Sequence, residues 1–197
     1  MIQSPFISNA PPSLTGKDFE ALIMFRARQM TEAGLWHFGR YGVKCVRMHD
    51  KLTGQLVLQE MQSLPDFEGS ISPSGRQVVA EAKVCSQASY KWEASTKTKQ
   101  HQIEHLLARS KMGALCWLIV HFNERQLQRK HEEPFTVAIP IYPDSQIVRD
   151  VLASGTKTLT RDEATLYGRP VPWTTFGSRG IKQTPDLSVL MTEWRAV

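Results

Sequence analysis

The feature that most constrains the fold is a nearly continuous apolar run over residues 114–122. An apolar run of this length without alternation is typical of a central strand that is buried on both faces of a sheet. Residues 99–112, just before it, have apolar side chains at helical spacing and end at Gly113. Residues 76–85 alternate in polarity, as a half-buried strand does. Together these segments predict a strand, a crossover helix and a buried strand.

The segments on either side predict further elements of one mixed domain. Thr15 can cap a first helix, because Asp18 three residues later completes a variant of the capping box. Two short strands with a turn between them are expected over residues 43–48 and 55–59. Near the C-terminus, a second capping box predicts a short helix over residues 160–167. Additional strands are expected over residues 135–141 and, at a sheet edge, residues 169–173.

These elements indicate the fold class and the organisation of the chain. We expect an α/β (α+β) fold in which a central mixed β-sheet is flanked by helices. Residues 1–14 are expected to form a flexible arm. Residues 15–197 are expected to form a single domain, with a core over residues 15–125 and a C-terminal elaboration over residues 126–197.

Composition narrows the class of protein. The chain has 197 residues, of which 41% are hydrophobic and 22% charged, so whole-chain disorder and a coiled coil are excluded. Its three cysteines are far apart in the sequence, which gives no support to a disulfide scaffold or a zinc ribbon. The longest apolar run is too short to cross a membrane, and the N-terminus does not resemble a secretory signal. We expect a soluble, cytoplasmic protein with no membrane partner.

Three side chains around the alternating strand carry the strongest chemical signal. Asp66 follows Pro65 at a bend, and Glu81 and Lys83 lie on one face of the strand. Two converging carboxylates can bind a hard cation such as Mg²⁺, with the backbone carbonyl of Ala82 as a further candidate ligand. The lysine can orient a water molecule and stabilise charge on a phosphate. The same pattern also fits a solvated, salt-bridged strand face.

The segments PDFEG, EAK and KQHQIEHLLARSKMGALCWLIVHF resemble the PD-(D/E)xK nucleases, and among them the RecU-type Holliday junction resolvases. The resemblance covers residues 15–125 well and implies a restriction-endonuclease-like core. It implies that Asp66 and Glu81 bind the metal and that Lys83 is catalytic. It also implies that Glu20, in the segment GKDFE, is an accessory ligand and that Gln102 faces the site.

One segment departs from this family. RecU proteins carry a protruding stalk ahead of the metal-binding Asp, whereas the segment at this position in this chain, residues 42–65, is short. We therefore expect a stalk that is reduced or absent.

The segment HQIEH also has a second interpretation. His101, Glu104 and His105 fit the H-x-x-E-H zinc motif, with both histidines on one face of a helix. Such a site needs a further acidic ligand downstream, and the sequence offers no compelling one. Histidines that lie near a phosphate-binding surface, or that are simply solvated, are the simpler interpretation.

The net charge of +5 is unevenly distributed along the chain. Between Lys83 and Lys111 there are six Lys or Arg residues and two acids, which gives this stretch a net charge of +4. Tyr90 and Trp92 lie among these cations, a combination that suits a phosphate backbone and an exposed base. Residues 87–99 are polar and predict a loop, and a solvated loop would have the same composition. The candidate DNA-binding residues are Lys17, Lys91, Lys97, Lys99, His101 and Gln102.

These observations and the resemblance lead to a functional prediction. We expect an endodeoxyribonuclease that depends on Mg²⁺, with Mn²⁺ able to substitute, and that resolves four-way DNA junctions by paired phosphodiester hydrolysis in recombination and repair. Because paired nicks need two active sites, we expect a homodimer, with the strands in residues 35–60 as one candidate interface. The alternatives are another PD-(D/E)xK nuclease, acting on duplex or flapped DNA in repair or restriction, and a non-catalytic DNA-binding module.

Overall fold

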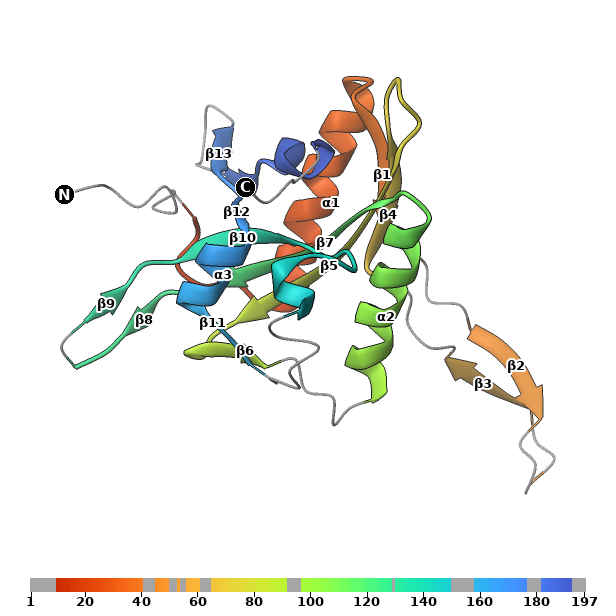
Figure 1. Cartoon of the computed structure of the whole chain (residues 1–197), viewed down its shortest axis with the longest axis horizontal. Coiled ribbons are helices and arrows are strands. Elements are labelled where there is room, and N and C mark those ends of the chain that lie inside the picture. The colour runs from red at the N-terminus through yellow and green to blue at the C-terminus, as the bar shows by residue number, and fades with distance from the viewer. Residues whose placement is uncertain are drawn as a thin grey trace.

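The centre of the computed structural model is a six-stranded mixed sheet with the strand order β1-β4-β5-β7-β10-β12 (Figure 1). The structure describes residues 10–40, 45–49, 53, 56–60, 65–91, 97–128, 130–149, 158–176 and 182–192. The strands of this sheet are β1 (Trp36–Arg40), β4 (Phe67–Ile71), β5 (Gln77–Cys85), β7 (Leu115–Phe122), β10 (Phe135–Pro140) and β12 (Arg169–Pro170). β5 and β7 are parallel, and the other neighbours are antiparallel. The predicted central mixed sheet is confirmed.

Helices and short strand pairs surround this sheet. The helices include α1 (Gly16–Glu32), α2 (Lys97–Lys111), α3 (Arg161–Tyr167) and the 3-10 helix η2 (Leu187–Met191). The strand pairs outside the sheet are β2 (Cys45–His49) with β3 (Leu56–Glu60), β6 (Ser89–Lys91) with β11 (Thr158–Thr160), β8 (Arg125–Gln126) with β9 (His131–Glu132), and β13 (Trp173–Phe176) with β14 (Lys182–Pro185). Within the described residues, no helix combines the length and the apolar character needed to span a membrane.

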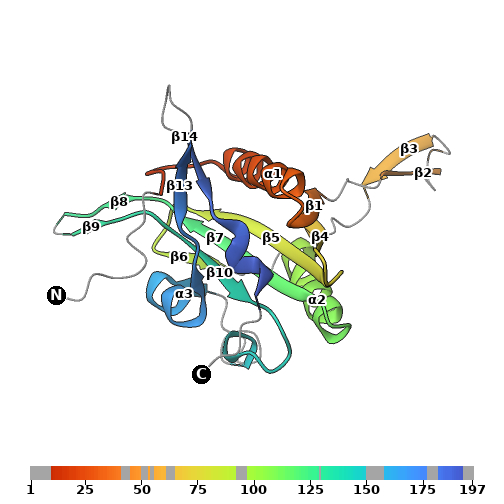
Figure 2. The ribbon, with the colours of Figure 1, turned by 90° about the horizontal axis from the view of Figure 1, so that it is seen from above.

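The two faces of the sheet are buried under different helices, as Figure 2 shows. Val78, Ala80 and Ala82 of β5 belong to the hydrophobic cluster that contains the buried residues of α1. Val79 of β5 belongs to the cluster on the other face, together with Leu106 of α2. The alternation of β5 therefore divides its side chains as the sequence predicts. Glu81 and Lys83 have the same parity as Val79 and face the side of the sheet that α2 covers.

Local sequence signals account for the helix ends. Thr15 caps α1 and forms the predicted capping box with Asp18. Thr160 and Glu163 form the second predicted capping box at the start of α3. Gly113 follows α2 with a φ of 92°, a left-handed conformation that a glycine adopts without strain. The crossover unit β5-α2-β7 lies within two residues of its predicted bounds.

The two strands predicted over residues 43–48 and 55–59 exist, but they do not enter the central sheet. β2 and β3 pair only with each other, and Figure 1 shows this hairpin projecting from the body of the molecule. Instead, β1 and β4, which precede and follow the hairpin in the sequence, pair with each other in the central sheet. A projecting hairpin therefore occupies the position where we expected a reduced or absent stalk.

Two other predictions differ from the structure. Residues 10–14 are held against the domain: Asn123 accepts a hydrogen bond from the Leu14 backbone N–H at 2.9 Å and donates one to its carbonyl at 3.1 Å. Ala10 is buried as well. The expected flexible arm is therefore wrong for these residues, and residues 1–9 lie outside the described part. The polar loop expected over residues 87–99 contains strand β6.

The C-terminal part completes the core. Residues 126–197 contribute β10 and β12 to the central sheet, and β12 forms the predicted edge strand. Leu187 and Leu190 of η2 are fully buried in the cluster under α1. The indole N–H of Trp117 donates to the carbonyl of Leu190 at 3.1 Å, which ties η2 to the centre of the sheet.

Candidate active site

Asp66 and Glu81 meet where β4 begins, because β4 and β5 are adjacent and antiparallel. Phe67 pairs with Ala80, so Asp66 lies beside the β5 segment that carries Glu81. The Asp66 backbone N–H donates to Glu81 Oε2 at 3.1 Å, and the Ala82 N–H donates to Asp66 Oδ2 at 2.9 Å. These reciprocal bonds fix the two carboxylates relative to each other. The predicted convergence of the two acids is present in the structure.

Lys83 completes this group. Its ammonium pairs with Glu81 Oε1 and lies 3.8 Å from Asp66 Oδ2. Glu81 is 1% exposed, so burial raises the pKa of Glu81 to about 7, and the Asp66 charge adds to that rise while Lys83 opposes it. A buried carboxylate in this setting needs a cationic partner to remain ionised.

Helix α2 covers the same face of the sheet. Its C-terminal turn lies over the start of β5, since Arg109 Nη2 donates to Gln77 Oε1 at 2.8 Å. Gln102 lies two turns earlier on α2 and is buried, which fits the expectation that it faces the site. His101 is half-buried beside it. Because α2 runs antiparallel to β5, its first half lies toward the end of β5 that carries Glu81 and Lys83.

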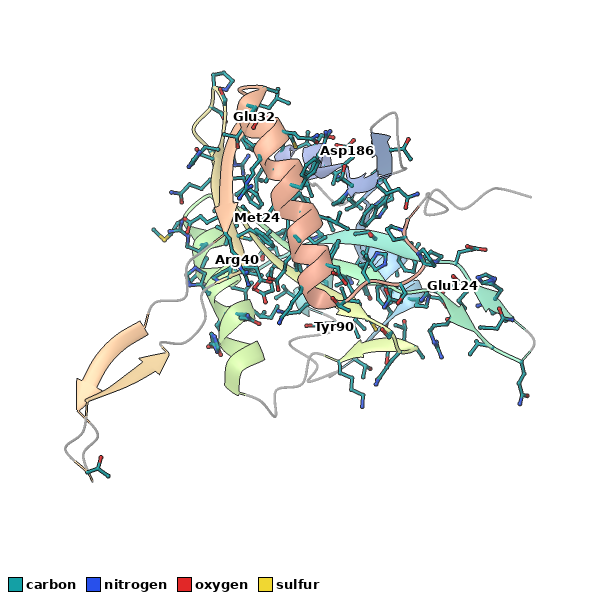
Figure 3. The ribbon with its side chains drawn as sticks, turned by 180° about the vertical axis from the view of Figure 1, so that it is seen from behind. Met24, Glu32, Arg40, Tyr90, Glu124 and Asp186 are labelled. Carbon is teal, nitrogen blue, oxygen red and sulfur yellow. The ribbon has the colours of Figure 1, made fainter. Side chains whose placement is uncertain are left out.

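Glu20 forms an ion pair with a residue of the strand next to β4. Its Oε2 lies 2.7 Å from Arg40 Nη2 at the end of β1, and Arg40 pairs in register with Phe67, the residue after Asp66. Figure 3 shows Arg40 beside α1, the helix that carries Glu20. Within the described part of the chain, no group of three or more His, Cys, Asp or Glu side chains is arranged to hold a metal ion.

The same finding applies to the H-x-x-E-H segment. His101, Glu104 and His105 lie on α2 as predicted, but they do not form a cluster of metal ligands. Burial and the Arg109 charge lower the pKa of His105, with Glu68 opposing them. The charges that act on His105 are therefore those of Arg109 and Glu68 and the neighbouring His101.

The candidate DNA-binding residues lie around the same end of the domain. Lys17 is exposed in the first turn of α1, and Lys91 is exposed at the end of β6. Lys97 and Lys99 lie in the first turn of α2, and their side chains fall outside the described part. The contact of these residues with DNA stays a prediction.

Two residues near the acids were missed from the sequence. Glu68 lies two positions after Asp66 and therefore on the same face of β4, where it pairs with Arg109 of α2. Tyr90 of β6 is buried, and that burial, followed by the charge of Glu81, raises its pKa. The spacing Asp66-x-Glu68 was a readable signal for Glu68 once β4 was known to be a strand. Tyr90 reaches the site only through tertiary folding.

A mixed sheet covered by helices, with an Asp and a Glu-x-Lys on adjacent strands, agrees with the core and the residues that the resemblance to PD-(D/E)xK nucleases implies. The family model of RecU, recombination protein U, matches residues 42–132. This segment contains Asp66, Glu81 and Lys83, and the match confirms the resemblance seen in the sequence.

No curated protein sequence matches the chain. Among solved structures, it is similar to Hjc, a Holliday junction resolvase from the archaeal hyperthermophile Archaeoglobus fulgidus. The TM-score is 0.42 and the sequence identity 13%, over 79% of this chain and 95% of that chain.

Proposed function

We propose that the protein is a metal-dependent endodeoxyribonuclease that resolves four-way (Holliday) DNA junctions by paired phosphodiester hydrolysis. The observation that carries the proposal is the hydrogen-bonded group of Asp66, Glu81 and Lys83, which lies inside the segment matched by RecU. A structural salt bridge would not need a second carboxylate beside a buried one, because the nearby negative charge makes the buried Glu81 harder to ionise. Such a pair is typical of a cation site.

The donor set fits a hard divalent cation. Asp66 and Glu81 supply carboxylate oxygens, and we propose the backbone carbonyl of Ala82 as a further ligand and Glu20 as an accessory one. When bound, Mg²⁺ would polarise the scissile phosphate and lower the pKa of a water molecule, and Mn²⁺ would substitute for it. The buried Glu81 carboxylate, now paired with Lys83, would gain a second source of positive charge.

The protein's own residues are proposed to orient the reactants and to stabilise the charge that develops during the reaction. Lys83 is proposed to orient the attacking water and to stabilise negative charge that develops on the phosphate. The hydrogen bonds from the Asp66 and Ala82 backbone N–H groups hold the two carboxylates in place, so little reorganisation is needed during reaction. Gln102 is proposed to contact the substrate from α2.

Lys17, Lys91, Lys97, Lys99 and His101 are proposed to bind the DNA backbone around the site. Each phosphate contact releases counterions, so binding weakens as salt rises. Neutralising Lys97 and Lys99 together should reduce the slope of log affinity against log salt by about two. A slope unchanged from that of the wild type would remove these two residues from the interface.

The enzyme is tested with a panel of labelled junctions, flaps and duplexes in the presence of Mg²⁺ or Mn²⁺. We expect paired symmetric nicks in the junction. Asp66→Asn and Lys83→Ala should each lower the cleavage rate at least about 100-fold, because each removes part of the charge stabilisation. Asp144→Asn and Lys130→Ala are matched controls, since both residues are exposed and lie outside the basic stretch of residues 83–111.

The outcomes separate the alternatives. Cleavage of flaps or duplex in preference to junctions would indicate another PD-(D/E)xK nuclease. Junction binding without cleavage would indicate a DNA-binding module. Normal cleavage by the Asp66→Asn and Lys83→Ala variants would disprove the proposed site. We also propose that the protein acts in the cytoplasm as a homodimer.

A further inference from the structure

Glu68 is a third carboxylate on the face of the sheet that carries the acidic pair. It lies two residues after Asp66, so both side chains point to the same side of β4. Glu68 pairs in register with Val79, which packs in the cluster under α2. Glu68 thus faces α2, as Glu81 does, and it lies two positions along the chain from Asp66.

Arg109 of α2 engages this carboxylate. Its Nη2 pairs with Glu68 Oε1 and donates to Gln77 Oε1 at 2.8 Å. The side chains of Glu68 and Arg109 are 21% and 22% exposed, so the pair is largely shielded from water and is stronger than a surface ion pair. The bond to Gln77 holds the guanidinium over the start of β5, away from Asp66.

We propose that Arg109 is a positioning residue that holds Glu68 out of the coordination shell of the metal. The inference rests on the proposed nuclease function and names which carboxylates the cation binds. Glutamate has a flexible side chain and would be drawn to a divalent cation beside Asp66 if it were free. With Glu68 as an added ligand, the protein would bind the cation more tightly, but this carboxylate would offset the positive charge that the phosphate needs and would occupy a ligand position.

The test is the affinity of the whole chain for Mn²⁺ in the absence of DNA, measured by isothermal titration calorimetry. Arg109→Met frees Glu68 to coordinate the cation and should therefore tighten Mn²⁺ binding about tenfold. The same variant should cleave junctions more slowly than the wild type. Glu68→Gln alone should leave the Mn²⁺ affinity unchanged, because Glu68 is not a ligand in the wild type.

The double variant distinguishes this role from a structural one. Adding Glu68→Gln to Arg109→Met should return the Mn²⁺ affinity to that of the wild type. Lys111→Met, an exposed cation of the same helical turn, should not tighten binding. A merely structural ion pair predicts the reverse, which is that every variant at Glu68 or Arg109 binds Mn²⁺ equally well or less well.

Two results would overturn the inference while leaving the proposed function intact. They are unchanged or weaker Mn²⁺ binding by Arg109→Met, and a loss of binding in Glu68→Gln as large as in Asp66→Asn. If Arg109→Met does not fold, Arg109→Gln, which removes the charge but keeps a polar side chain, replaces it under the same criterion: tighter Mn²⁺ binding supports the inference, and unchanged or weaker binding overturns it. A wild-type chain that binds no Mn²⁺ would overturn the proposed function and this inference together.

Discussion

Glu81 is the residue on which the chemistry of the site depends most. A carboxyl that is 1% exposed is costly to ionise, and its burial raises its pKa to about 7. Lys83 and the Asp66 backbone N–H favour the charged form. Glu81 therefore titrates near neutral pH, whereas an exposed glutamate would be fully ionised there.

This pKa predicts how metal binding depends on pH. A cation binds the ionised carboxylate, so below pH 7 it must displace a proton from Glu81. Mn²⁺ affinity should then fall about tenfold for each pH unit below pH 7 and should level off above it. The measurement is calorimetric titration of the wild type between pH 5.5 and pH 8.5.

Asp18 provides the matched comparison for that titration. It is an exposed carboxyl whose pKa is lowered by its hydrogen bonds with Thr15, so Asp18→Asn should leave the pH profile unchanged. An affinity that is flat across this range in the wild type would show that Glu81 is already ionised or is not a ligand.

At the scale of elements, β1 is an edge strand of the sheet and pairs with β4, which begins directly after Asp66. The two strands approach closely at Gly69, where an added Cβ would lie 2.1 Å from the backbone oxygen of His37. A backbone oxygen in a ladder cannot move without breaking the pairing. Gly69→Ala should therefore lower the free energy of unfolding by about 1–3 kcal/mol.

Gly39 is the control for this substitution, because it lies in the partner strand and a Cβ there would meet no atom within 4 Å. Gly39→Ala should change the stability little. Urea unfolding of both variants gives the comparison. Equal stability of the two variants would contradict the close approach of β1 and β4.

The elements that the sequence predicts well are those with strong local signals. α1, α3 and the unit β5-α2-β7 have capping boxes, helical spacing or long apolar runs, and their bounds agree with the structure. β1 and β4 were missed because they are short and each contains a glycine, which weakens the strand pattern. The separate pairing of β2 with β3 depends on tertiary structure, because their strand patterns do not specify a partner.

The N-terminal arm shows another limit of local patterns. Asn123 lies after β7 and binds Leu14 more than a hundred residues earlier, and its side chain also donates to Ser86 Oγ at 2.8 Å. Because Asn123 is 4% exposed, its loss would leave backbone groups of the arm without these partners. Asn123→Ala should lower the free energy of unfolding by about 1–3 kcal/mol.

The control for the arm is Gln128→Ala, which changes an exposed amide a few residues later in the chain. It should unfold like the wild type. Thermal unfolding of both variants decides the matter, and an Asn123→Ala variant as stable as the wild type would mean that the arm is not held in solution.

At the scale of the molecule, the distribution of charge agrees with the proposed site. The stretch from Lys83 to Lys111 has a net charge of +4, and it comprises the end of β5, β6 and α2, which surround the acidic pair. The sequence pointed to Asp66, Glu81 and Lys83 through the bend at Pro65, the alternation of β5 and the resemblance to a nuclease family, and their catalytic roles stay a prediction. It did not identify the Glu20–Arg40 and Glu68–Arg109 pairs, because each joins elements whose contact is set by the whole fold.

Paired cleavage of a symmetric junction requires two copies of this site, since each chain carries one group of Asp66, Glu81 and Lys83. Mixed dimers of wild-type and Asp66→Asn chains, purified with two different affinity tags, should nick one strand of a junction and leave it unresolved. Homodimers of the wild type should release two nicked duplexes.

Supercoiled plasmids with an extruded four-way junction separate these outcomes, because a single nick relaxes the plasmid and paired nicks linearise it. Mixed dimers should therefore give relaxed circles. Linear product from mixed dimers, at half the wild-type rate, would show that one active site cuts both strands in turn. The two sites would then act independently, and dimerisation would not be what makes cleavage symmetric.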